Sequence, residues 1–321
     1  MIIKVSRAHA AAVLGAMLQI ALAHGEPEVT DADRATIDAA ARIVLGLEPV
    51  PDLAPCSPAR LANLMLSQED ATQAVRMLAV MSLVDGRIDA EKTALVAEYA
   101  RALRVDEAYL RVLAEAAQGE IAAATACMVR RNVASFPLID PTGIDTDPVA
   151  PFLPYRDGHD DPELAARYAQ LAHLPEGTFG RAFWEHFQRN GFAFPGEENG
   201  LVEGFTTPHD TSHVLSGYST SQQGELCVST FIGAMHPDHP MSAEVLPVLF
   251  SWHLGIKLNE IARSSTGAFE PRRFWTAWDR GAATTVDVLD PGWDFWAATP
   301  VPLEELRRAY AVPAVDPALL A

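Results

Sequence analysis

The sequence predicts a mainly all-α protein with two helical domains joined by a linker rich in proline and aspartate. Apolar residues recur at helical spacing through most of the 321 residues. Ser, Thr or Asp precedes many of these stripes and Gly follows several, as expected at helix ends. No stretch alternates polar and apolar residues long enough to require a sheet. The predicted domains are residues 1–134 and 162–321, with residues 135–161 as the linker.

The first domain is predicted as a compact helical bundle with short connections. Thr30 and Asp89 are expected to open two of its helices, and Asp106 to cap a third. The apolar run at residues 8–23 imitates a signal peptide after Lys4, but its leucines recur at helical spacing, which favours a packed first helix. The clearest apolar stripe comprises Ala74, Met77, Leu78, Met81 and Val84.

Residues 78–103 contain an apolar helix, the turn Asp85-Gly-Arg-Ile-Asp89 and a second helix with an acidic start. This segment resembles the tellurite-resistance-B-like (TerB-like) family of helical domains. The resemblance implies that Asp85 and Asp89 present carboxylates to a metal. The residues alone offer another explanation, in which Asp85 belongs to a helix stop and Asp89 caps the next helix.

The linker, residues 135–161, alternates prolines with aspartates and has no periodic apolar pattern, which predicts a semi-extended segment. Beyond it, helices are expected over residues 164–171, 178–190 and 245–261, and a strand-like run over residues 284–289.

Three of the histidines outside the metal motif described next carry expectations of their own. His186 is expected on the polar side of its helix, at the surface. His236-Pro-Asp-His239-Pro is expected to form a turn that ends a helix, because its prolines exclude a regular helix. A second cluster of metal ligands is the alternative for this pair.

Residues 205–231 form the stretch that best suits a metal ion. His209 and His213 are four residues apart, so a helix would place both imidazoles on one face. Glu225 is close enough to fold back toward them, and Asp210 is a candidate fourth ligand. Two imidazoles with one or two carboxylates suit Zn²⁺ as first choice, with Fe²⁺ and Mg²⁺ as alternatives, and leave positions open for substrate or water.

The same residues also have structural explanations. Thr207 and Pro208 are expected to cap and begin the histidine helix, and Gly217 to end it. Asp210 lies three residues after Thr207, where it could complete a capping box. Glu225 could be an ordinary acid in the first turn of the following helix, where the helix dipole favours it.

The pattern His209-Asp210-x-x-His213, eleven residues, Glu225 resembles the metal motif of the ubiquinone (coenzyme Q) biosynthesis family. Leu174-Pro-Glu-Gly-Thr-Phe-Gly-Arg181 resembles a second segment of that family, and the stretch from Arg280 to Arg307 resembles its C-terminal pattern. The resemblance covers roughly residues 165–315. One departure is the segment over residues 202–206, which lacks the arginines usual in the family.

The resemblance implies a metal-dependent decarboxylase, simple or oxidative, that acts on a prenylated aromatic acid with His209, Asp210, His213 and Glu225 as its metal-binding and catalytic residues. It also implies that the helix over residues 245–261 lines a prenyl tunnel. Other quinone-biosynthesis proteins, a second copy of the chain and the periphery of the inner membrane are the expected partners. The alternatives are a non-catalytic prenyl-lipid-binding scaffold, a relative acting on another aromatic or quinone-like substrate, and a metal phosphohydrolase.

Charge and cysteine content restrict the remaining function classes. The net charge of −18 argues against nucleic acid and anionic membrane surfaces, because both require basic patches. Cys56, Cys127 and Cys227 are scattered and form no CxxC pair, which predicts a cytoplasmic protein without disulfides or a thiolate zinc site. No uninterrupted apolar stretch reaches the roughly 18 residues that predict a membrane span.

Overall fold

A computed structural model describes residues 5–24, 29–48, 52–142, 144–156, 158–259 and 263–320. These residues form helices and loops, and they contain no strand beyond two isolated bridges. The bridges join Thr178 to Pro302 and Leu254 to Thr266. The predicted all-α fold class is therefore confirmed.

The N-terminal half largely has the predicted helix ends. Thr30 caps the second helix and Asp89 the fifth. The predicted Asp106 cap is wrong, since the N-cap is Glu107, whose carboxylate is paired with Arg76 rather than with the helix end. The helices are α1 (Ala10–Ala21), η1 (Leu22–His24), α2 (Asp31–Ala39), η2 (Ala40–Val44), α3 (Pro58–Ala62), α4 (Gln68–Met81), α5 (Ala90–Leu103), α6 (Ala108–Ala117) and α7 (Ile121–Ser135).

A single buried core holds the N-terminal helices together. Met77 and Leu78 of the predicted stripe are inaccessible to solvent, and α1 packs into the same core as a regular helix. The core also contains side chains from the C-terminal half. Trp275 is one of them, and its indole N–H donates to the Thr36 carbonyl at 3.1 Å. The first core thus extends across the predicted linker, and the domain boundaries stay a prediction.

The C-terminal half contains α8 (Pro162–Ala169), η3 (Gln170–His173), α9 (Phe179–Asn190), α10 (Glu203–Ser216), α11 (Gln222–Met235), η4 (Pro240–Val245), α12 (Leu246–Val248), η5 (Leu249–His253), α13 (Pro271–Ala283), α14 (Phe295–Ala298), α15 (Leu303–Ala309) and η6 (Pro317–Leu319). Both η4 and η5 are π-helical.

Two predicted elements of this half are wrong. The continuous helix over residues 245–261 is instead a π-α-π segment that ends at His253, and Pro247 within it has no N–H for a regular helical bond. Residues 260–262 lie outside the described residues. The strand-like run over residues 284–289 is a loop, because the Asp287 side chain accepts the Leu289 N–H at 3.0 Å and turns the chain.

A second core is rich in aromatic side chains. Phe179, Phe183 and Phe187 occupy one buried face of α9, the helix predicted over residues 178–190. Phe152 of the predicted linker is buried in the same core. The described part of that segment consists mainly of turns and packs against the rest of the protein there. His159 in the same segment is exposed.

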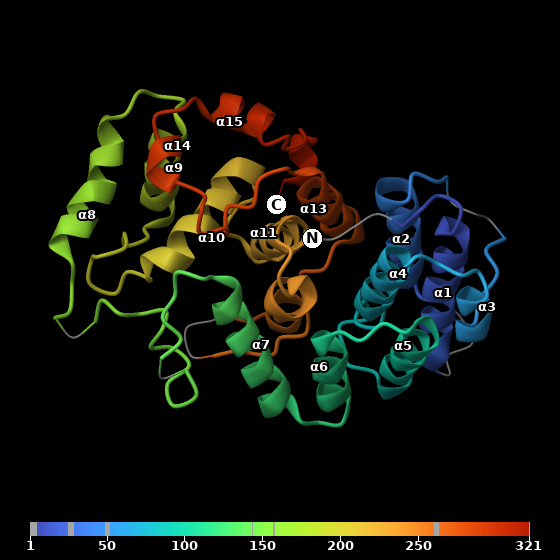
Figure 1. The fold of residues 1–321 in the computed structure, drawn as a ribbon. Helices are drawn as coiled ribbons and strands as arrows, with labels where there is room; N and C mark the ends of the chain where they lie inside the picture. The colour runs from blue at the N-terminus through green and yellow to red at the C-terminus, as the bar shows by residue number, and fades with distance from the viewer. Residues whose placement is uncertain are drawn as a thin grey trace.

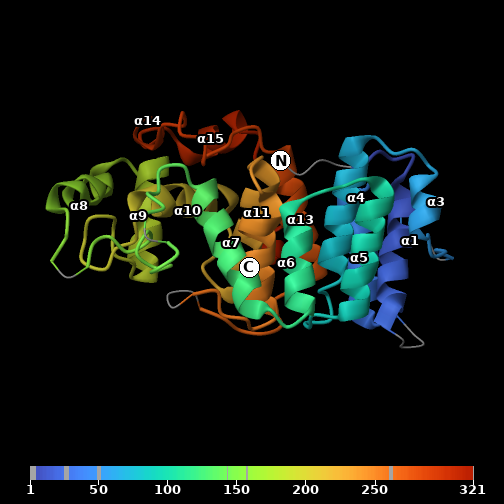
Figure 2. The ribbon, with the colours of Figure 1, turned by 60° about the horizontal axis from the view of Figure 1, so that its bottom comes forward.

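The two cores meet along α11 and α13. These helices run through the middle of the molecule, with α1 to α5 on one side and α8 to α10 on the other (Figure 1). The same order is visible after rotation, with α6 and α7 beside α11 and α13 (Figure 2). No helix in the described ranges has both the length and the apolar character to cross a membrane.

Candidate metal centre

The histidine helix α10 begins earlier than predicted, at Glu203, so that Thr207 and Pro208 lie inside it. Tyr168 explains the earlier start. Its hydroxyl lies 2.9 Å from Glu203 Oε1 and 2.5 Å from Thr207 Oγ1, so it holds two successive turns of the helix together. Gly217 ends the helix in the left-handed conformation at φ 83°, as predicted.

Helix α11 presents Glu225 from its first turn. Ser221 caps the helix by accepting the Gly224 N–H at 3.1 Å. Because Ser221 caps the helix, the Glu225 side chain is not needed as a cap. It extends toward His209 and His213 of α10 instead.

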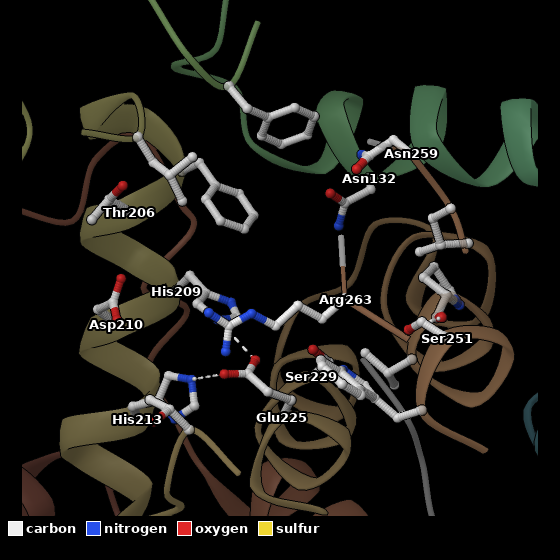
Figure 3. A pocket seen from close by; sticks show the side chains of 18 of the residues that line it. Asn132, Thr206, His209, Asp210, His213, Glu225, Ser229, Ser251, Asn259 and Arg263 are labelled. Carbon is white, nitrogen blue, oxygen red and sulfur yellow. Dashed lines mark hydrogen bonds and ion pairs between the residues drawn. The ribbon is translucent and has the colours of Figure 1, made fainter. Parts of the chain in front are cut away.

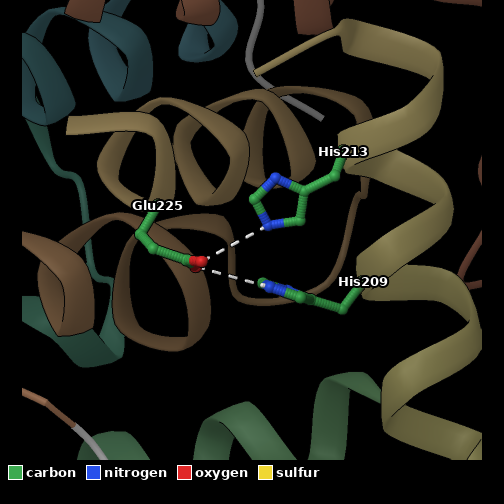
Figure 4. A group of neighbouring side chains, drawn as sticks. All are labelled: His209, His213 and Glu225. Atoms are coloured by element: carbon green, nitrogen blue, oxygen red, sulfur yellow. Dashed lines mark ion pairs between the residues drawn. The ribbon is translucent and has the colours of Figure 1, made fainter. Parts of the chain in front are cut away.

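His209, His213 and Glu225 converge on one point between the two helices (Figure 4). Nε2 of His209 lies 3.5 Å from Oε2 of Glu225, and Nε2 of His213 lies 3.5 Å from Oε1. The three candidate ligand atoms all lie within 4.8 Å of one another. The structure therefore brings together three of the four predicted ligands.

His213 is oriented as a metal ligand would be. Its Nδ1 lies 2.9 Å from the Tyr218 carbonyl oxygen, which can only accept, so Nδ1 carries the hydrogen. In the neutral imidazole Nε2 is then a bare lone pair directed at Glu225. This buried Nε2 has no hydrogen-bond partner in the described parts of the chain. Metal-bound histidines commonly donate their second N–H to a carbonyl in this way.

Glu225 and His213 shift each other's pKa toward the charged form. Burial alone would raise the pKa of Glu225, but the adjacent His213 and His209 hold that pKa well below its usual value. Burial would lower the pKa of His213, but the Glu225 carboxylate outweighs it and raises this pKa. Glu225 is therefore an anion in the folded protein, as a carboxylate ligand must be.

The donor set fits a divalent transition metal. Two imidazole nitrogens and one carboxylate form the set found in several catalytic zinc sites and in non-haem iron sites. Three protein donors leave positions open for a ligand, whereas a structural zinc site usually has four.

The structure does not bring Asp210 into this group. Its Oδ1 lies 2.8 Å from Nε2 of His186, and its place within α10 also excludes the predicted capping role. The surface position predicted for His186 is wrong, because its side chain is buried against Asp210 and stacks on His213 with ring centroids 5.3 Å apart. Only these contacts reveal the Asp210–His186 pair, since 24 residues separate its members.

Substitution of Asp210 by Asn is expected to leave the metal content of the purified protein nearly unchanged. Asn keeps an acceptor for His186, and Asp210 lies outside the three-residue group. Elemental analysis of D210N beside H213A checks this. Equal loss of metal from both variants would show that Asp210 is a ligand.

The predicted alternative ligand pair, His236 and His239, has partners outside the candidate metal centre. His236 directly follows α11, as the predicted turn requires, and its Nδ1 lies 2.8 Å from Oδ2 of Asp287. His239 Nε2 lies 2.9 Å from Nη1 of Arg131. Neither imidazole belongs to the group of His209, His213 and Glu225.

The carboxylates predicted for a TerB-like metal site also have other partners. Asp85 Oδ2 lies 2.5 Å from Nζ of the buried Lys92, which is 3.6 Å from Oδ1 of the buried Asp33. Asp89 accepts the Lys92 backbone N–H as the cap of α5. The Lys92 ammonium group thus lies beside Asp85, at the position where the TerB-like resemblance implies a metal ion.

A cavity of about 1330 Å³ opens beside the three candidate ligands. Helices α7, α9, α10 and α11 and the π-helical segments η4 and η5 contribute to its walls. Arg263 lines the cavity from the side opposite α10 (Figure 3). The lining includes the apolar side chains of Val129, Phe152, Phe187, Leu201, Phe205 and Trp252.

No protein-family model, curated protein or solved structure matches the chain. The functional interpretation of the site therefore rests on its geometry and on the motifs of the sequence itself.

Proposed function

We propose that the chain binds a divalent cation, with Zn²⁺ as first choice, through His209, His213 and Glu225, and that it decarboxylates an aromatic acid with a prenyl or similar apolar chain. The observation that carries the metal assignment is the buried Nε2 of His213. Its lone pair faces Glu225, and the Tyr218 carbonyl already binds the other ring nitrogen.

The cavity supports an aromatic ligand. The Phe205 ring stacks on His209 at 5.1 Å with an interplanar angle of 14°, and Phe152 meets Phe205 edge to face at 5.2 Å. These rings form an apolar wall next to the candidate metal centre, which suits an aromatic ring. Arg263 supplies a guanidinium for a carboxylate from the opposite wall, although the segment over residues 202–206 lacks arginine.

A bound divalent cation would supply a Lewis acid that stabilises negative charge on the ligand carboxylate, phenolate or ring. The protein residues have separate tasks. Phe205 and Phe152 hold the ring and exclude water, while the Tyr218 carbonyl fixes the orientation of His213. The Asp210–His186 pair packs beside His213 and restrains its ring.

Turnover by the purified protein tests this function. Zinc-loaded wild-type protein is expected to release carbon dioxide from a prenylated para-hydroxybenzoate, aerobically or anaerobically, and H213A is expected to lose this activity. His159→Ala is the matched control, because His159 is exposed and outside the cavity lining. Tight binding of the acid without any product would contradict the enzyme and support the lipid-binding scaffold instead.

A further inference from the structure

The same cavity contains a second buried carboxyl group, Glu244, which the proposed chemistry does not use. Glu244 lies in the π-helical turn η4 and is 3% exposed, yet it lines the cavity. Its immediate partners are uncharged, since Ser135 Oγ lies 2.9 Å and Asn132 Nδ2 3.5 Å from its Oε1. Both contacts use the same oxygen, and Oε2 has no hydrogen bond to the described residues. π-Helical turns are rare and often occur at functional sites.

Helix α11 links Glu244 to the candidate metal centre. Glu225, Ser229 and Gly233 follow one another at four-residue steps and so lie along one face of this helix. Glu244 packs on Gly233, where an added Cβ would come within 3.0 Å of the Glu244 Cβ. Eight residues of helix correspond to about 12 Å, which places Glu244 that far along α11 from Glu225. Ser229 also lines the cavity and lies near Glu225 (Figure 3).

The hydrogen bonds around Ser135 can accommodate a neutral Glu244. Ser135 Oγ lies 2.7 Å from the Asn132 carbonyl and 2.9 Å from Glu244 Oε1, but a hydroxyl has only one hydrogen to donate. The Asn132 carbonyl is in the last turn of α7, and the Phe136 N–H donates to Val133 instead, so the Ser135 hydroxyl serves this carbonyl. With its hydrogen on that carbonyl, Ser135 Oγ accepts from a protonated Oε1, whereas an ionised Glu244 would take the Ser135 hydrogen instead.

The electrostatic surroundings agree with this assignment. Burial raises the pKa of Glu244 to about 8; it outweighs a hydrogen bond from Ser135, which lowers this pKa, and the negative charge of Asp287 adds to the increase. In the protonated group with the hydrogen on Oε1, Oε2 is a carbonyl oxygen without a hydrogen bond to the described residues. A buried acceptor of this kind is stabilised when a bound molecule donates a hydrogen bond to it.

We propose that Glu244 is a second ligand-binding group, whose Oε2 accepts a hydrogen bond from a hydroxyl or amino group located about 12 Å from the metal-bound end of the ligand. This inference rests on the proposed function and adds a substrate class to it. The preferred ligand is an aromatic acid whose apolar chain ends in, or carries, a polar donor, and it binds more tightly than an acid with an entirely hydrocarbon chain.

Two isosteric probes test the subsite. They are para-heptylbenzoate and para-(hydroxyhexyl)benzoate, in which a hydroxyl replaces the terminal methyl group. Calorimetric titration of zinc-loaded wild-type protein is expected to show about threefold to tenfold tighter binding of the hydroxyl probe, as one net hydrogen bond provides. E244Q is expected to keep this preference, because its amide N–H can donate to Ser135 while its carbonyl faces the cavity. E244L is expected to lose the preference and still bind the heptyl probe.

The outcomes separate the two proposals. Equal affinity of wild-type protein for both probes, or an unchanged preference in E244L, overturns the Glu244 subsite alone. If neither probe binds wild-type protein, or if H213A binds the probes as tightly as wild type, the proposed metal-dependent function is overturned. The Glu244 subsite, which rests on that function, is then overturned as well. Thermal melting of E244Q and E244L at acidic pH verifies that both variants are folded.

Discussion

Replacement of Lys92 by Met is expected to lower the free energy of unfolding by about 3–5 kcal/mol, the usual effect of removing one member of a buried ion pair. Lys92 and Asp33 are both inaccessible to solvent, and Asp85 is 13% exposed. Without the ammonium group, two carboxylates are left buried close together without their counter-charge. Chemical denaturation of wild-type and variant protein at neutral pH measures the difference.

The chain offers a matched control for this substitution. Its lysines are Lys4, Lys92 and Lys257, and Lys257 is exposed, so K257M is expected to change stability by less than about 0.5 kcal/mol. The combined variant D33N/K92M is expected to be more stable than K92M, since one of the uncompensated charges is gone. A loss below about 1 kcal/mol in K92M would show that the buried pair does not form.

Substitution of Glu244 by Gln is expected to stabilise the protein increasingly as pH rises from about 4.5 to about 8. Burial raises the pKa of Glu244 to about 8 from its ordinary 4.5. Below the ordinary value both folded and unfolded chains are protonated at this residue. Above it the unfolded chain ionises first, so the wild-type protein loses about 1.4 kcal/mol of stability per pH unit until the folded protein also ionises.

Gln does not titrate, so the difference between the two proteins isolates Glu244 from all other ionisable groups. Denaturation curves at several pH values between 4 and 9, flanking the two pKa values, measure this difference. It should be smallest at the acidic end and level off once Glu244 ionises in the folded protein. A constant difference across the range would contradict a neutral, buried Glu244 and would also remove the basis of the ligand subsite.

Local sequence signals predicted much of the fold and the centre of the site. Thr30 and Gly217 mark helix ends because capping depends on a few neighbouring residues. The four-residue spacing of His209 and His213 places both rings on one side of α10, wherever that helix begins. Glu225 was within reach because a short turn joins the two helices.

The remaining features depend on contacts between distant parts of the chain. Helix α10 starts at Glu203 because Tyr168 binds its first two turns. No residue near Glu203 in the sequence predicts this start. His186 has an ordinary polar position within α9, and only the packing of α9 on α10 buries it against Asp210. Glu244 is buried by a contact with Ser135 of α7, which lies 109 residues away in the chain, so no local signal could predict it.

The metal content of the purified protein tests the central claim most directly. Wild-type protein should retain about one divalent ion per chain after gel filtration, as expected for a three-ligand site. H213A and E225A, each folded by circular dichroism, should retain almost none, while H159A should match the wild type. Full metal content in both H213A and E225A, or a wild-type protein that binds no divalent ion, would contradict a metal centre at His209, His213 and Glu225.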